Sequence, residues 1–183
     1  MSGKTNFWIR SRVRVGYPVA VAAFAFAHPQ IKWLLCGVGI AIGGLLLRGY
    51  AAGHLRKHQQ LATSGPYGFT RNPLYLGSVL LAAGFSVASH SWVSTLLLAA
   101  YLGIFYPVVI RREQSELLTH YGDAFVRYAS IVPAFWPRFS PAVKSTEQFS
   151  WPLYLKNREY EASIGLAVAI AILIIIMLLR RGV

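Results

Sequence analysis

Long apolar blocks, separated by short polar stretches, dominate the hydrophobic pattern of this chain of 183 residues. Five blocks stand out, at residues 13–27, 31–47, 74–88, 92–110 and 162–179. A membrane-spanning helix needs roughly 17–25 mostly apolar residues. The second, fourth and fifth blocks reach that length alone, and the first and third reach it with their flanks. The pattern predicts an all-α, polytopic helical membrane protein with about five transmembrane helices, folded as a single domain over residues 1–183.

The composition and the charge distribution support this prediction. Hydrophobic residues make up 55% of the chain and charged residues only 13%, and the formal net charge is +12. If the N-terminus is cytoplasmic, 15 of the 18 Lys and Arg residues fall inside, and only Lys32, Arg180 and Arg181 fall outside. This is the positive-inside bias of membrane proteins, so we expect membrane lipids and no nucleic acid as partners. Residues 48–72 and 111–161 then share the N-terminal side, with His90 opposite.

The second apolar block is rich in glycine. Gly39 and Gly43 stand four residues apart, a spacing that predicts close contact with a neighbouring helix through this face. A dinucleotide-binding loop is excluded, because no strand pattern precedes these glycines and no acidic residue occurs before Glu113.

Two polar segments flank the third and fourth blocks. Residues 64–77 read Ser-Gly-Pro-Tyr-Gly-Phe-Thr-Arg-Asn-Pro-Leu-Tyr-Leu-Gly, and residues 111–122 begin Arg-Arg-Glu-Gln-Ser-Glu-Leu. Pro73 suits the first turn of the third helix, with Asn72 as its cap. So many polar groups beside spanning helices are expected where they line a site. One helical hairpin separates the segments, which therefore predict the two halves of a single pocket at one membrane face.

The acidic residues sharpen this prediction. Glu113 and Glu116 are three residues apart and share one face of a helix that continues beyond the fourth block. Local ion pairs at a solvated helix end are the alternative. However, Arg71 and Tyr75 start the neighbouring helix at the same membrane face, and carboxylates with aromatic rings suit a cationic ligand. No Cys/His spacing indicates a metal site.

The two segments resemble the isoprenylcysteine carboxyl methyltransferases and their relatives, which include the phospholipid N-methyltransferases. The resemblance covers residues 61–137, with motifs at 61–77 and 110–137. The residues at the motif positions are Leu61, Thr63, Ser64, Gly65, Tyr67, Arg71, Asn72, Pro73, Tyr75, Gly77, Glu113, Gln114, Leu117, Tyr121, Gly122, Phe125, Tyr128, Val132 and Pro133. Both motif halves occur in order, which makes the match specific.

The resemblance implies a membrane enzyme that binds S-adenosylmethionine without a Rossmann fold. It implies Arg71, facing the acceptor, and Glu113 as catalytic residues. The implied cofactor contacts are Ser64, Gly65, Pro66, Tyr67, Asn72, Pro73, Tyr75, Glu113 and, outside the strict pattern, Glu116. Asn72, Gln114 and Phe125 replace a histidine, a glutamate and a tyrosine of the family pattern, and Gln59 replaces another histidine. These departures bear on the acceptor more than on the cofactor.

The implied function is methyl transfer to a lipophilic acceptor, with the carboxylate of an isoprenylcysteine-like molecule as first choice. A phospholipid amine or a small thiol is the alternative, and it would need a base such as Glu113, Glu116 or His58. A non-catalytic scaffold that keeps the fold is the alternative from another class. We expect an integral protein of a bacterial inner membrane with its site facing the cytoplasm. The last helix, 162–179, and the oligomeric state have no assignment from the sequence.

Overall fold

The computed structural model describes the backbone of residues 2–56, 59–143 and 147–181, and the side chains of residues 11–180 within these ranges. Seven α-helices and one 3-10 helix occupy this part of the chain, and no strand occurs in it. They are α1 (Ser2–Ala25), α2 (Ile31–Ala52), η1 (Gly65–Gly68), α3 (Pro73–Ser89), α4 (Trp92–Tyr121), α5 (Asp123–Ile131), α6 (Trp151–Lys156) and α7 (Tyr160–Arg181). The predicted all-α class is confirmed.

Several of these helices have the length and composition of membrane spans. Among the described residues, α2, α4 and the segment Tyr160–Arg180 of α7 meet both criteria, and α3 is a shorter apolar helix. The first predicted span falls in α1, which is not among them; its N-terminal part carries Arg10, Arg12 and Arg14. The protein is therefore a helical integral membrane protein.

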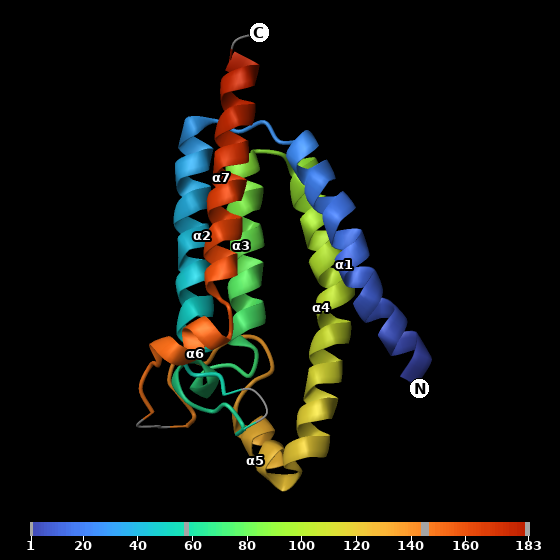
Figure 1. Ribbon diagram of the computed structural model, residues 1–183, viewed down its shortest axis with the longest axis vertical. Helices are drawn as coiled ribbons and strands as arrows, with labels where there is room; N and C mark the ends of the chain where they lie inside the picture. Colours follow the sequence, from blue (N-terminus) through green and yellow to red (C-terminus); the bar gives the residue numbers. More distant parts are fainter. Residues whose placement is uncertain (1, 57–58, 144–146, 182–183) are drawn as a thin grey trace.

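The long helices form two groups that diverge toward one end (Figure 1). In one group α2 packs along α3 with α7 beside them, and in the other α1 packs along α4. The N-terminus, α5 and α6 lie at the open end, which we call the motif end because residues 61–77 and 110–137 gather there. The turns at 26–30 and 90–91 lie at the opposite end, the turn end, where the His28 amide donates to the Ser89 carbonyl (2.8 Å).

Glycines allow the close packing of α2 on α3, although not the glycines expected. A Cβ on Gly37 would overlap the carbonyl oxygen of Gly84, and a Cβ on Gly44 would lie 2.6 Å from that of Gly77. A Cβ on Gly39 or Gly43 would meet nothing within 4 Å. The prediction of a Gly39–Gly43 contact face was wrong, because residues seven apart return to the same helix face and Gly37 and Gly44 are the pair turned toward α3.

The start of α3 also differs in detail from the prediction. Pro73 occupies the first turn and Asn72 the N-cap position, but the Asn72 side chain makes no capping hydrogen bond. Its Nδ2 instead donates to the carbonyl oxygen of Ala134 (2.6 Å). Asn72 therefore ties the start of α3 to the segment that follows α5.

Candidate functional site

Hydrogen bonds join the two motif segments at the motif end. The Arg71 amide donates to the Pro133 carbonyl (2.9 Å), and the Ala142 amide donates to the Gly68 carbonyl (2.8 Å). The Thr70 hydroxyl donates to the carbonyl of Phe135 (2.9 Å). Because these bonds hold both backbones, the loop before α3 cannot shift without carrying residues 133–142 with it.

A small core supports this junction from α5. Phe125, Tyr128 and Val132 are buried together, with Leu61 and Leu117 packed against them. The Tyr128 hydroxyl donates to the Tyr67 carbonyl (2.7 Å), so α5 reaches directly into the first segment. Burial raises the pKa of Tyr128, which keeps this hydroxyl protonated as a donor.

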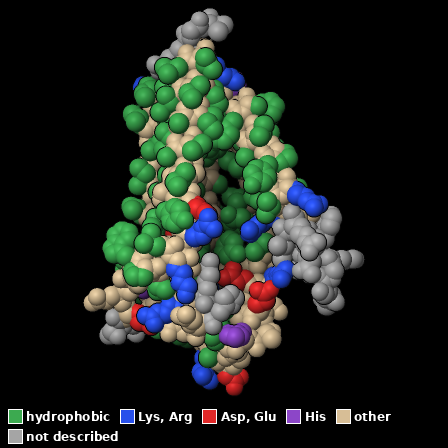
Figure 2. Space-filling model, in the orientation of Figure 1, with side chains coloured by type: hydrophobic (Ala, Val, Ile, Leu, Met, Phe, Trp, Pro, Cys, Tyr) green, Lys and Arg blue, Asp and Glu red, His purple; other side chains and the backbone are tan. Residues whose placement is uncertain are grey.

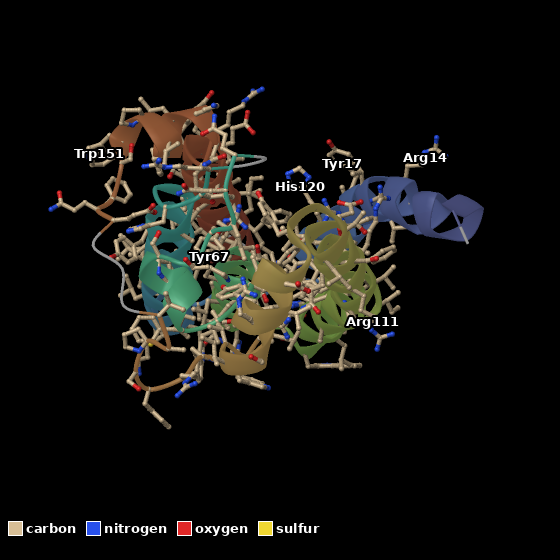
Figure 3. The ribbon with its side chains drawn as sticks, turned by 90° about the horizontal axis from the view of Figure 1, so that it is seen from below. Arg14, Tyr17, Tyr67, Arg111, His120 and Trp151 are labelled. Atoms are coloured by element: carbon tan, nitrogen blue, oxygen red, sulfur yellow. The ribbon has the colours of Figure 1, made fainter. Side chains whose placement is uncertain are left out.

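A polar cavity of about 910 Å³ lies where the two segments and the ends of α2 and α4 meet. Viewed from the motif end, Tyr67 lies toward the middle of the molecule, whereas Arg111 and Trp151 point outward (Figure 3). Six of the predicted site residues line the cavity: Tyr67, Arg71, Asn72, Tyr75, Glu113 and Glu116. The fold therefore brings both halves of the predicted pocket to one place.

Tyr75 and Glu113 link the two halves inside the cavity. The Tyr75 hydroxyl is hydrogen-bonded to the Glu113 carboxylate, and its ring packs edge-on against Tyr106 at 5.2 Å between centroids. Glu116, one turn further along α4, forms an ion pair with Arg112 (2.6 Å) at the exposed surface. Glu113 thus contacts the first motif segment, whereas Glu116 makes the local ion pair that the sequence offered as the alternative.

Two buried polar atoms at this cavity have no hydrogen-bond partner in the described part of the chain. They are the Tyr67 hydroxyl oxygen and the Arg71 Nε. Burial, with Glu113 as a second cause, raises the pKa of Tyr67, and burial lowers the pKa of Arg71. The Arg71 guanidinium lies 5.9 Å from the centre of the Phe125 ring. Since an unsatisfied buried polar atom is costly, a polar ligand in the cavity would supply what these two atoms lack.

The remaining predicted cofactor residues shape the loop rather than line the cavity. Gly65 has φ +55°, a left-handed conformation that favours glycine, and its Cα faces the His54 ring. Pro66 is buried in η1, and Pro73 is buried at the start of α3. The structure therefore gives these three residues a conformational role next to the cavity.

Ser64 holds a second loop in place. Its hydroxyl donates to Glu147 Oε2 (3.0 Å), while Gln60 Nε2 donates to Glu147 Oε1 (3.0 Å). These hydrogen bonds, with that from Ser64 first, lower the pKa of Glu147. Glu147 was not predicted from the sequence, because nothing near it in the chain marks it as the partner of a serine 83 residues away.

A second, apolar cavity of about 370 Å³ lies deeper between the helices. Its walls come from α1, α3, α4 and α7, including Ala162 and Gly165 of α7. Ser78, Tyr101 and Tyr106 line both cavities, so the two are neighbours. Figure 2 shows this face, with hydrophobic side chains around a hollow between the helix groups and charged side chains below it.

Arg48, which lines the polar cavity and pairs with Glu159, was also not predicted as a site residue from the sequence. The available signal was an arginine directly after the apolar block 31–47, in a helix that continues to Ala52. The candidate base His58 lies outside the described residues. Within the part of the chain that the structure describes, no three His, Cys, Asp or Glu side chains are grouped to hold a metal ion.

The fold and the site define a helical membrane bundle with a polar cavity between two motif segments. Comparison with known proteins identifies its family. Residues 47–124 match the phospholipid methyltransferase family. Protein-S-isoprenylcysteine O-methyltransferase of Schizosaccharomyces pombe is 27% identical over 129 residues, 66% of this chain and 55% of the relative. No solved structure matches the chain.

Two further relatives cover more of the chain. The cobalt-zinc-cadmium resistance protein CzcN of Cupriavidus metallidurans is 34% identical, and the nickel-cobalt-cadmium resistance protein NccN of Alcaligenes xylosoxydans is 36% identical. Each match spans 149 residues, 74% of this chain and 68% of the relative. The chain belongs to the integral-membrane methyltransferase family that joins the phospholipid and isoprenylcysteine enzymes, which confirms the resemblance found in its motifs.

Proposed function

We propose that this protein transfers a methyl group from S-adenosylmethionine to the carboxylate of a lipophilic, isoprenylcysteine-like acceptor. The observation that carries the proposal is a polar cavity, built by both family motifs, that adjoins an apolar cavity between the membrane helices. A lipophilic acceptor needs both environments at once, one for its polar head and one for its hydrocarbon.

The residues on the polar cavity fit the cofactor. Tyr67, Asn72, Tyr75 and Glu113 would hold it, with Glu116 at the rim and residues 64–66 and Pro73 shaping the loop. When bound, S-adenosylmethionine supplies an electrophilic methyl group on a positively charged sulfur. A carboxylate and aromatic rings suit that charge. Ligand sites usually span about 300–1,000 Å³, so a cavity of about 910 Å³ also leaves room for an acceptor head group.

The charge around the cavity supports an anionic acceptor. Among the described residues the lining arginines outnumber the lining carboxylates: Arg12, Arg48, Arg56, Arg71 and Arg112 against Glu113 and Glu116. A carboxylate with a pKa of about 3.5 is already ionised at neutral pH, so it needs no general base. Arg71 would orient it, since a guanidinium can hold both carboxylate oxygens.

A phospholipid amine is the second candidate, favoured by the family match over residues 47–124. An amine or a thiol must lose a proton, and Glu113, hydrogen-bonded to Tyr75, would be the base. The names of CzcN and NccN refer to metal resistance, which does not indicate an acceptor. We further propose that the motif end faces the cytoplasm of a bacterial inner membrane, because most basic residues lie at that end.

Cofactor binding tests the proposal before any acceptor is known. We expect S-adenosylmethionine to bind the detergent-purified protein in calorimetry, and Glu113→Gln and Tyr75→Ala to weaken that binding by roughly tenfold or more, as expected for a lost hydrogen bond to a charged group. Glu161→Gln is the matched control, because Glu161 pairs with Arg158 at the surface outside the cavity.

Wild-type affinity in both cavity variants would refute the two-segment cofactor site. If the cofactor site holds, activity with labelled cofactor and prenylcysteine, phospholipid or thiol acceptors would identify the acceptor. A protein that binds the cofactor but methylates none of the three classes would favour the non-catalytic scaffold.

A further inference from the structure

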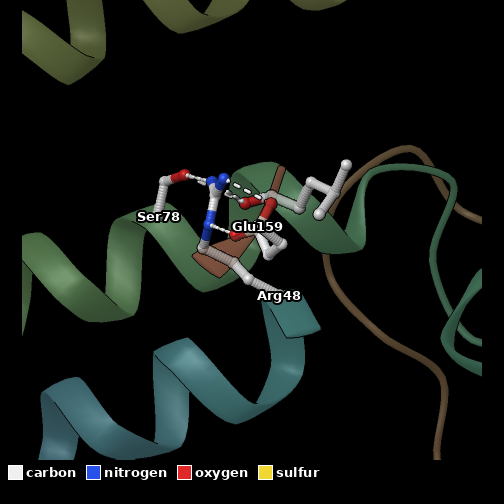
Figure 4. A network of polar contacts seen from close by, with 4 residues as sticks. Arg48, Ser78 and Glu159 are labelled. Atoms are coloured by element: carbon white, nitrogen blue, oxygen red, sulfur yellow. Dashed lines mark hydrogen bonds and ion pairs between the residues drawn. The ribbon is translucent and has the colours of Figure 1, made fainter. Parts of the chain in front are cut away.

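Arg48, near the end of α2, is held by four hydrogen bonds (Figure 4). Its Nε donates to Glu159 Oε1 (2.5 Å) and its Nη2 to Glu159 Oε2 (3.1 Å). Its Nη1 donates to the Ser78 hydroxyl (2.5 Å) and to the Leu74 carbonyl (3.2 Å). The Glu159 side chain is only 6% exposed, so this two-point ion pair is shielded from solvent.

The local backbone is arranged so that this pair can form. The Arg48 side chain crosses α3 over Gly77, where a Cβ would lie 2.5 Å from the Arg48 Cγ. Arg158 has φ 55°, an uncommon value for a residue with a side chain, in the turn that presents Glu159. Asn157 Nδ2 fixes the same turn by donating to the carbonyls of Ala52 (2.9 Å) and Leu55 (2.8 Å). Glu159 and this turn lie outside residues 47–124, the part of the chain that matches the family.

The position of the Arg48 guanidinium relates it to both cavities. Arg48 lines the polar cavity, and its partner Ser78 lines the polar and the apolar cavity alike. A molecule with its head in the first cavity and its hydrocarbon in the second would place the junction of the two beside Ser78. The guanidinium is therefore next to the atoms that link head and tail.

Arg48 also keeps a donor for such a molecule. A guanidinium has five N–H groups, and partners in the described residues take four of them. The remaining N–H is on Nη2, and the side chain is 22% exposed. Because Glu159 already balances the charge, this donor suits an oxygen such as a carbonyl or a carboxylate beside hydrocarbon, without needing a full counter-ion.

We infer that Arg48 binds an oxygen of the acceptor at the junction of its polar head and its hydrocarbon, and that Glu159 is the positioning residue that holds Arg48 there. The inference rests on the proposed function for the lipophilic nature of the acceptor. It assigns to the segment after α6 a part in acceptor selection, separate from the cofactor residues.

Direct binding of an amphiphile tests this assignment without relying on turnover. The probe is radiolabelled N-acetyl-S-farnesylcysteine, added to the detergent-purified protein, with S-adenosylmethionine affinity measured in parallel by calorimetry. We expect Arg48→Gln/Glu159→Gln to lose roughly tenfold or more in probe affinity, the loss typical of a hydrogen bond to a charged group. Cofactor affinity should stay within a few-fold of wild type.

Asn157→Ala is the control for a loosened segment, because it removes the bonds to Ala52 and Leu55 but keeps the Arg48–Glu159 pair, and Asn157 lines neither cavity. It should lower the melting temperature and leave probe affinity within a few-fold of wild type. Glu159→Gln alone serves if the double variant does not fold. It should raise the KM for the acceptor while the KM for the cofactor stays unchanged.

Wild-type probe affinity in the double variant would overturn the inference. An equal loss of probe affinity in Asn157→Ala would overturn it too, because Arg48 would then only hold the segment in place. An unchanged acceptor KM in Glu159→Gln would overturn it as well. Each of these outcomes leaves the proposed function standing. A wild-type protein that binds the cofactor and neither binds nor methylates the probe would refute the carboxylate acceptor and this inference together.

Discussion

Arg71 lies at the junction of the two motif segments, and its surroundings distinguish two roles. Its amide is fixed by Pro133, while its guanidinium lies near the Phe125 ring and its Nε has no partner among the described residues. Arginines at helix ends often extend toward lipid phosphates, a role that lysine fills equally well. A two-point hydrogen bond to a carboxylate needs the planar guanidinium.

Arg71→Lys separates these roles. We expect cofactor affinity to stay within a few-fold of wild type and turnover to fall roughly tenfold or more, which corresponds to about 1.4 kcal/mol of transition-state stabilisation. Steady-state kinetics with labelled cofactor measures the turnover. Arg111→Lys is the control, because Arg111 is exposed on α4 and points away from the cavity (Figure 3). Near-normal turnover in Arg71→Lys would exclude Arg71 from the site and favour an amine or thiol acceptor.

At the scale of elements, the contact between α2 and α3 positions the site. Half of the Arg48 network depends on it, since Arg48 comes from α2 while Ser78 and Leu74 come from α3. The helices approach closely only because Gly37 meets Gly84 and Gly44 meets Gly77. In a bilayer, where apolar surface gains little from leaving lipid, such close backbone packing is the main source of helix association.

Gly37→Ala and Gly39→Ala form a matched pair within α2. The first adds a methyl group against the Gly84 carbonyl and the second adds one facing open space. We expect Gly37→Ala to destabilise the protein by about 1–3 kcal/mol, as overpacking usually does. Gly39→Ala should be neutral or slightly stabilising. Thermal unfolding in one detergent measures both, and equal melting temperatures would contradict the observed α2–α3 interface.

At the scale of the whole molecule, the helices alternate in direction, so the N-terminus lies at the motif end and the C-terminus at the turn end (Figure 1). His90 and His120 are both exposed; His90 lies just before α4, which has 30 residues, and His120 lies in its last turn. At 1.5 Å per residue α4 is roughly 45 Å long, more than the hydrocarbon thickness of a bilayer. The two histidines should therefore be in water on opposite sides.

Cysteine labelling in intact inverted vesicles tests this orientation. On a Cys36→Ser background, which removes the single native thiol, we expect His120→Cys to react with an impermeant maleimide added to the cytoplasmic face. His90→Cys should react only after the membrane is permeabilised. Labelling of both positions from one side would contradict the alternating topology, and the reverse pattern would place the motif end outside.

Hydropathy and local motifs determined much of this protein from the sequence alone. An apolar block is a property of residues that are close together in the chain. The sequence therefore predicted the helical membrane class and the placement of residues 61–77 and 110–137 at one end of the molecule. The sequence also predicted that Tyr75 and Glu113 lie at the same membrane face, because one helical hairpin separates them. It did not predict that their two side chains meet.

Only the tertiary structure decided which side of each helix faces a partner. Gly37 rather than Gly39 contacts α3, Asn72 bonds to Ala134 instead of capping its helix, and Arg48 pairs with Glu159. The last two contacts join residues 62 and 111 positions apart. Their formation depends on how the packed helices are rotated and how they cross. No local pattern in the chain encodes this, because a spanning helix is apolar both on the side that packs and on the side that faces lipid.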